Sequence, residues 1–220
     1  MEFFGVVNPN LKRVNKTVHF LMSVSNGLFE MALKKFPDWL TKTNYGRKSA
    51  ISTVALFGKV KGAQWPLSKK SEFNGIGSLC AGLPHFAEGI WRCWGRDTLI
   101  SLRGSLILTG RLDEAVAGLV AFGSTLRHGL IPNLLGEGKV SRYNCRDATW
   151  FWLNSVKDLY QVQPPILEYK IPTGFISDDA DFNIDDNDQF KTVLELIFEI
   201  VDRHATGIDF IERNAGPKVN

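Results

Sequence analysis

The residues of this chain whose types and spacing best suit chemistry are two Arg-Asp dipeptides, Arg96-Asp97 and Arg146-Asp147. A guanidinium and a carboxylate can together bind ring hydroxyl groups, and an indole ring packs against the C–H face of a sugar. Tryptophans adjoin both dipeptides, namely Trp91, Trp94, Trp150 and Trp152. The combination predicts a sugar-binding site. It also permits a structural interpretation, in which each Asp caps a helix and pairs with its neighbouring Arg.

Four further residues stand in Gly- and Asn-rich segments near these dipeptides. Glu137, flanked by two glycines, is either a candidate acid or a solvated loop residue. His85 is either a sugar ligand or a structural residue of its loop. Arg142 and Asn144 either line the mouth of the site or hold the loop before Arg146.

Several other classes of site are not supported. The sequence has neither a Gly-x-Ser-x-Gly elbow nor a Gly-Lys-Ser/Thr phosphate loop, so we expect neither a serine nucleophile nor a nucleotide site. The three cysteines lack CxxC spacing, which argues against a disulfide framework and a zinc site. The acidic segment 178–188 resembles a calcium loop, but Asp186 and Thr192 stand where such a loop needs Gly and Glu. We therefore predict no metal and no cofactor.

Composition narrows the class of protein. The chain has 220 residues, of which 44% are apolar and 22% charged, and its net charge is +3. This charge is too small and too evenly spread for an obligate nucleic-acid or membrane-surface protein. The N-terminus does not resemble a secretory signal, and no apolar stretch approaches the ~18 residues of a membrane span. We expect a cytoplasmic protein with neither a nucleic acid nor a membrane as partner.

The elements that must position these residues are helical. Apolar residues recur at three-and-four spacing in five segments, which are 18–36, 97–109, 115–126, 147–160 and 190–201. The segments 97–109 and 147–160 are apolar on more than one face, so we expect other helices to surround them. The run Ile51–Phe57 permits a helix or a strand. Because no other segment alternates convincingly, we predict an all-α fold.

The connections bring the two dipeptides together. The turn Gly110–Leu112 is short, so the helices on either side of it should pack antiparallel. The helices that begin at Asp97 and Asp147 then run parallel, with their N-termini at one end. The long segments 73–96 and 129–146 open at that same end, and long ordered loops commonly carry function. The sequence therefore predicts one mouth, with a rim of tryptophan, that holds both Arg-Asp pairs.

Several longer strings resemble a known family, the C-terminal amylo-α-1,6-glucosidase domain of eukaryotic glycogen debranching enzymes. The strings that carry the resemblance are Ala81–Phe86, Arg92–Thr98, Thr125–Gly138, Arg142–Ala148 and Glu212–Pro217. The resemblance implies a partial (α/α)6 toroid, glucoamylase-like, of which residues 81–220 form about the first half and carry the glucose-binding mouth. Residues 1–80 match less distinctively and are interpreted as an N-terminal helical part of the same domain.

The resemblance also implies an activity and roles for residues. The family cleaves the α-1,6-linked glucose at a branch of glycogen or limit dextrin with inversion, within glycogen catabolism. By similarity Arg96 and Asp97 hold the terminal glucose, with Trp94 beside them. The remaining predicted substrate-binding residues are His85, Glu137, Arg142, Asn144, Arg146 and Asp147.

The family's acid and base are expected in Trp-Met-Asp and Gly-Pro-Glu-Trp motifs, which this chain lacks. An inverting glycosidase needs two carboxyl groups about 6.5–9.5 Å apart. We therefore predict no catalytic residue here and no hydrolysis by the chain alone. A partner that supplies the missing half of the toroid is one expectation. A non-catalytic glycan-binding or scaffold fragment is the alternative.

Overall fold

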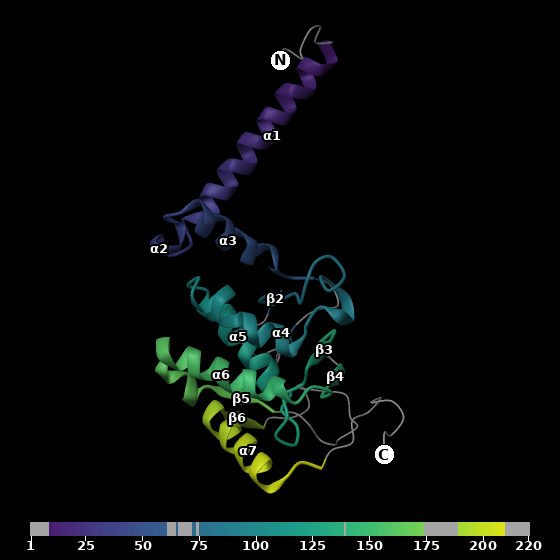
Figure 1. The fold of residues 1–220 in the computed structure, drawn as a ribbon, viewed down its shortest axis with the longest axis vertical. Coiled ribbons are helices and arrows are strands. Elements are labelled where there is room, and N and C mark those ends of the chain that lie inside the picture. The colour runs from purple at the N-terminus through teal and green to yellow at the C-terminus, as the bar shows by residue number, and fades with distance from the viewer. Residues whose placement is uncertain are drawn as a thin grey trace. The chain divides into compact units, whose positions relative to one another are not determined.

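The computed structural model describes residues 9–60, 65, 72–73, 75–138, 140–173 and 189–209 (Figure 1). The chain divides into two compact units, Met1–Ser52 and Thr53–Asn220. The calcium-like segment 178–188 and the string Glu212–Pro217 lie outside the described residues. The division of the chain at residue 80 stays a prediction.

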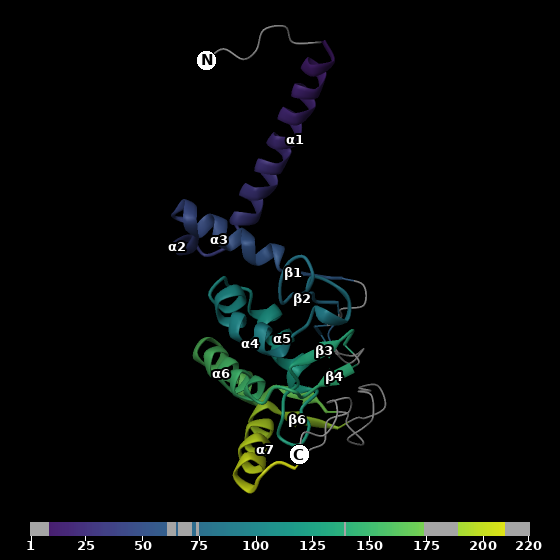
Figure 2. The ribbon, with the colours of Figure 1, turned by 45° about the vertical axis from the view of Figure 1, so that its right-hand side comes forward.

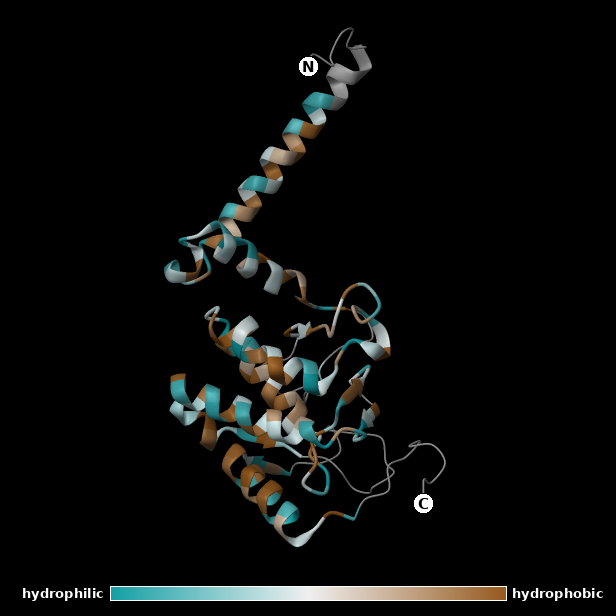
Figure 3. Ribbon diagram, viewed as in Figure 1, coloured by the Kyte–Doolittle hydropathy of each residue, from teal (hydrophilic) through white to brown (hydrophobic). Residues whose placement is uncertain are grey.

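The first unit is helical. Its elements are α1 (Pro9–Leu33), α2 (Asp38–Thr41) and most of α3 (Asn44–Ala55). Its buried apolar residues are Leu33, Phe36 and Ala50. Gly46 allows a close approach, because a Cβ atom there would lie 1.9 Å from the carbonyl oxygen of Leu40. Hydrophilic and hydrophobic residues alternate along α1 (Figure 3). Within the ranges that the structure describes, no helix is both long and apolar enough to cross a membrane.

The second unit contains the predicted site. Its helices are α4 (Gly95–Leu102), which continues into a π-helical turn (Arg103–Ile107), α5 (Leu112–Gly123), α6 (Asp147–Val162) and α7 (Val193–Thr206). Two short 3-10 helices, Gly89–Trp91 and Pro164–Glu168, precede α4 and follow α6. In both ribbon views α5, α6 and α7 follow one another in layers, with β5 and β6 near α7 (Figures 1 and 2). The predominantly helical fold is confirmed.

The core of this unit surrounds α5. Ala115 through Gly123 are all buried, so this helix is covered on every side. The indole N–H of Trp152 on α6 donates to the Leu119 carbonyl at 2.9 Å. A Cβ atom at Gly123 would lie 3.0 Å from the Trp152 ring. The prediction that 97–109 is surrounded is wrong in part, since Ile100 is exposed. In α5, by contrast, several alanines and glycines let neighbouring elements approach from every side. The apolar spacing of its sequence predicted only one buried face.

Short strands were not predicted. The described residues include three two-stranded antiparallel ladders: β1 (Phe57–Gly58) with β2 (Ser78–Leu79), β3 (Leu134–Gly136) with β4 (Val140–Arg142), and β5 (Lys170–Pro172) with β6 (Phe190–Thr192). Each strand has two or three residues, too few for a visible alternation. Phe190, predicted to lie on a helix, lies in β6, and α7 begins after it at Val193.

Candidate functional site

The two long loops of the second unit are joined by their backbones. The Leu135 N–H donates to the Cys93 carbonyl at 2.9 Å, and the Gly95 N–H donates to the Asn133 carbonyl at 2.6 Å. Trp94 and Leu134 form an antiparallel bridge between these two bonds. The prediction that the loops gather at one end is confirmed. We call these two hydrogen bonds and the bridge that they form the loop clasp.

The N-termini of α4 and α6 lie side by side, joined by an ion pair. The Nε and Nη2 atoms of Arg96 each lie 3.1 Å from Oδ1 of Asp147, and Nη2 lies 3.0 Å from Oδ2. The Ser155 hydroxyl also donates to the Leu99 carbonyl at 3.1 Å, one to two turns further along both helices. The two helices are therefore parallel, as the connections predicted.

The pairing is crossed between the dipeptides. Arg96 binds Asp147 rather than its neighbour Asp97, and neither Asp caps its helix, because the cap residues are Trp94 and Arg146. The structural interpretation, in which each Asp caps a helix and pairs with the adjacent Arg, is wrong. The side chains of Arg96 and Asp147 are 47% and 45% exposed, so a ligand can reach both.

Cys145 is hydrogen-bonded to both members of this ion pair, a role that was not predicted from the sequence. Its thiol donates to Asp147 Oδ1, and its sulfur accepts from Arg96 Nη2. The thiol hydrogen bond, followed by Arg96, lowers the pKa of Asp147 below its ordinary value. Partial burial and the neighbouring Asp147 raise the pKa of Cys145. At neutral pH the cluster therefore consists of a carboxylate, a guanidinium and a neutral thiol.

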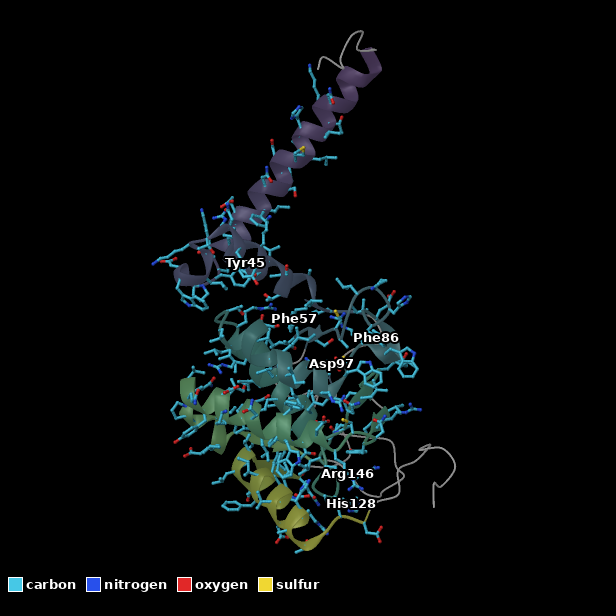
Figure 4. The ribbon with its side chains drawn as sticks, viewed as in Figure 1. Tyr45, Phe57, Phe86, Asp97, His128 and Arg146 are labelled. Atoms are coloured by element: carbon cyan, nitrogen blue, oxygen red, sulfur yellow. The ribbon has the colours of Figure 1, made fainter. Side chains whose placement is uncertain are left out.

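Asp97 lies on a small cavity. It lies in the first turn of α4, and no residue in the described ranges donates to its carboxylate. The cavity has a volume of about 250 Å³, slightly below the ~300–1,000 Å³ of typical ligand pockets. Its lining residues are Leu56, Leu79, Cys80, Ala81, Asp97, Ile100, Ser101 and Ser105. An apolar wall with one carboxylate and two hydroxyl groups suits a single small polar ring. Figure 4 labels Asp97 on α4.

The four tryptophans that adjoin the two dipeptides do not lie together. Trp91 and Trp94 stack with ring centroids 5.9 Å apart and planes inclined by 14°. The Phe86 ring meets Trp94 edge-on at 6.3 Å. Trp150 packs instead on His204 of α7. The prediction that Trp152 lies at the mouth is wrong, because its ring is completely buried in the core.

The remaining predicted residues lie on the same two loops. Glu137 occupies the tip of the β3–β4 hairpin with a φ of 53°, and Arg142 lies in β4. Within the described part of the chain, no side chain of the following residues is hydrogen-bonded to Arg96 or Asp147: His85, Glu137, Arg142, Asn144 and Arg146. All are exposed except the half-buried Arg142. Their role in binding stays a prediction.

Arg92 supports the first loop from inside. It is only 3% exposed, and its guanidinium donates to the Ser78 hydroxyl and carbonyl and to the carbonyls of Gly58 and Ala87. These bonds tie the residues before Trp94 to β1 and β2. Sequence reasoning assigned Arg92 no role, because only tertiary structure shows its partners.

No group of three His, Cys, Asp or Glu side chains in the described ranges could hold a metal ion. The chemistry present is a half-exposed Arg–Asp pair, an accessible carboxylate on a small cavity, and stacked indoles on the adjoining loop. Arg96, Asp147 and Trp94 do not line the cavity, and each of these three features by itself is of a kind that can bind a polyhydroxylated ring.

A largely helical chain with such a site has the features expected of a carbohydrate-active protein, and comparison with known proteins gives the family. The model of the amylo-α-1,6-glucosidase family matches residues 52–218, and the chain belongs to this family. It is similar to the glycogen debranching enzyme of Saccharomyces cerevisiae, with 50% identity over 151 residues. The matched region covers 66% of this chain, which spans 10% of the length of that relative.

Proposed function

We propose that this chain supplies the glucose-binding mouth of an amylo-α-1,6-glucosidase that acts on the branch points of glycogen or limit dextrin. The Arg96–Asp147 pair carries this proposal. It joins residues far apart in the sequence, and both of its side chains remain accessible. In this role Arg96 and the two aspartates bind the hydroxyl groups of a terminal glucose, and Trp94 packs against its C–H face.

The proposal extends to the architecture. An (α/α)6 toroid is built from consecutive helical hairpins, in which every second helix runs in the same direction. The parallel helices α4 and α6, with α5 between them in the sequence, fit this pattern, and their N-termini would lie at the mouth of the ring. The strands within the described residues are few and short, which is compatible with such a ring. We propose that the chain forms about half of this toroid. The other half would come from additional chain or from a partner.

Binding and hydrolysis should be separable in this chain. The sequence lacks the two motifs in which the family's acid and base are expected, and inversion requires both carboxyl groups. The chain alone should therefore bind a branched glucan and release no glucose from it. In that respect it would act as a glycan-binding part of a longer site.

The test is a titration of the full chain with isomaltose, followed by NMR of the ligand and by calorimetry. Arg96→Gln removes the guanidinium fork while keeping a polar side chain, and should weaken isomaltose binding at least tenfold, about 1.4 kcal/mol. Lys191→Gln, which removes the ion pair between β6 and α7, is the matched control and should bind isomaltose as the unmodified chain does.

Equal binding by the Arg96→Gln and Lys191→Gln variants would remove the basis for a glucose site at this pair. Incubation of the unmodified chain with a phosphorylase limit dextrin tests the second part of the proposal. Glucose release above that of a heat-denatured sample would contradict the proposed absence of the acid and base.

A further inference from the structure

Two of the three cysteines lie at the base of the first long loop, and the proposed glucose site uses neither of them. The Ala81 N–H donates to the Arg92 carbonyl at 3.0 Å, which holds the two ends of the segment 81–92 together. Cys80 and Cys93 stand one residue outside this bond, one on each side. Residues that flank such a bond in an antiparallel pair have Cα atoms about 4.5–5.5 Å apart, within the range of about 4.4–6.8 Å that a disulfide spans.

The surroundings of Cys93 also place it beside Cys80. The Ser78 side chain is hydrogen-bonded to Cys93, and Ser78 and Cys80 are two residues apart along one extended segment, so their side chains point to the same face. Burial raises the pKa of Cys93, the Ser78 hydrogen bond and the Arg92 guanidinium lower it, and nearby Cys80 raises it again. The two sulfur atoms are therefore within electrostatic range of each other.

The two thiols differ in access from solvent. Cys93 is 1% exposed and belongs to the core cluster, whereas Cys80 lines the cavity of about 250 Å³. Exposed Asp97 and Ile100 also line this cavity, so it opens to the surface. Its volume admits a molecule little larger than water. A small oxidant thus reaches Cys80 first and finds Cys93 behind it. Figure 4 labels Phe86 on the loop that the two cysteines bound, and Asp97 on α4.

We propose that Cys80 and Cys93 are an oxidation site, at which hydrogen peroxide forms one reversible disulfide. The Cys80 sulfur attacks a peroxide oxygen, the O–O bond breaks, and Cys80 becomes a sulfenic acid while the displaced hydroxide leaves as water with the thiol proton. The Cys93 sulfur then attacks the Cys80 sulfur, the S–O bond breaks, and the hydroxyl group leaves as a second water with the Cys93 proton. The two thiols lose two electrons, and one peroxide is reduced to two waters.

The disulfide would act on the loop clasp. The Cys93 carbonyl accepts one of the two clasp hydrogen bonds, and Trp94 forms the bridge beside it. A bond from Cys93 to Cys80 therefore ties the clasp covalently to the end of β2. One reversible bond differs from a structural disulfide framework, and disulfides in reducing compartments are usually transient and redox-sensing. The inference goes beyond the proposed function and does not depend on sugar binding.

The experiment treats the folded full chain with one equivalent of hydrogen peroxide, labels the remaining thiols with N-ethylmaleimide, and maps the peptides by mass spectrometry. Labelled thiols should fall from three to one, with Cys145 still labelled and the Cys80 and Cys93 peptides linked. Tm should rise by about 6–12 °C, the effect of closing a loop of about 15 residues in a chain of this size. Dithiothreitol should reverse both changes.

Variants at the three cysteines provide the controls. Cys145→Ser keeps the pair, so its two thiols should both be lost and its Tm should rise as in the unmodified chain. Cys80→Ser and Cys80→Ala each remove one partner and should show neither the link nor the rise in Tm. The proposal is overturned if all three cysteines of the folded chain stay labelled, if the link involves Cys145, or if it joins two copies. A Cys80–Cys93 link that leaves Tm unchanged overturns the proposed effect on the clasp.

Discussion

Replacement of Gly95 by alanine tests whether the loop clasp positions the Arg96–Asp147 pair. A Cβ atom at this position would lie 2.3 Å from the Pro132 carbonyl oxygen and 3.0 Å from the Phe122 ring. An ordinary contact needs 3.4 Å or more. The start of α4 and the loop at Pro132 must therefore separate by about 1 Å, although the Gly95 and Asn133 backbones are hydrogen-bonded to each other.

The expected cost follows from this overlap. Forcing an extra methyl group into a packed position costs about 1–3 kcal/mol, partly offset by the better helix propensity of alanine. We expect the Gly95→Ala variant to lose about 2 kcal/mol of unfolding free energy, which lowers Tm by about 4–8 °C in a chain of this size. Displaced Arg96 should also bind Asp147 less well, so the pKa of Asp147 should return toward its ordinary value.

Gly104→Ala is the control for this experiment. Gly104 lies in the π-helical turn, and a Cβ atom there would meet nothing within 4 Å. This variant should be neutral or more stable by up to about 1 kcal/mol. Thermal melts followed by circular dichroism compare the two variants, and carboxyl NMR reports on Asp147. Equal melting temperatures for Gly95→Ala and Gly104→Ala would refute the claim that close contact at Gly95 sets the geometry of the mouth.

Three further predictions concern the core, the cluster and a helix cap. Trp152→Ala should cost about 3–5 kcal/mol in urea denaturation, because it leaves a large cavity beside α5. Cys145→Ala should raise the pKa of Asp147 in a carboxyl NMR titration. Because the folded-state pKa of Asp147 is depressed, the stability it contributes is present above its unfolded value and is lost as pH falls through the folded value. Thr192→Ala should cost about 1 kcal/mol, since it removes the capping box with Glu195.

Each of these predictions has a control in the same unit. Trp150→Ala removes a half-exposed ring and should cost less than about 1 kcal/mol. Cys145→Ser keeps a donor to Asp147 and should leave the pKa of Asp147 lowered. Thr206→Ala removes a hydroxyl that donates to the carbonyl of Asp202 within α7, and should change stability little. A Thr192→Ala variant as stable as Thr206→Ala would contradict the capping argument.

Helix positions and helix direction could be predicted from the sequence. Apolar spacing located α6 and α7 within a few residues, and the short turn before α5 gave the parallel arrangement of α4 and α6. That arrangement was enough to bring Arg96 and Asp147 together before any distance was known. Apolar periodicity gives the helix positions and connection length gives the helix directions, because both are properties of a few neighbouring residues.

The missed features depend on contacts between distant residues. Strands of two or three residues form here because the helices bring their partner strands close, and no local sequence pattern predicts such short strands. The role of Cys145 depends on Arg96, which lies in the first turn of α4, far from Cys145 in the sequence. The burial of Trp152 did have a signal. It lies on one helical stripe with Ala148 and Val156, both buried, whereas Trp150 lies off that stripe.

The loop clasp has a thermodynamic consequence for any ligand of the mouth. Its backbone bonds join the two loops as part of the fold, so the conformational entropy of ordering the joined segments is lost during folding and not during association. Sugar binding should then resemble docking into a rigid receptor, with a small heat-capacity change and an association rate little affected by loop motion.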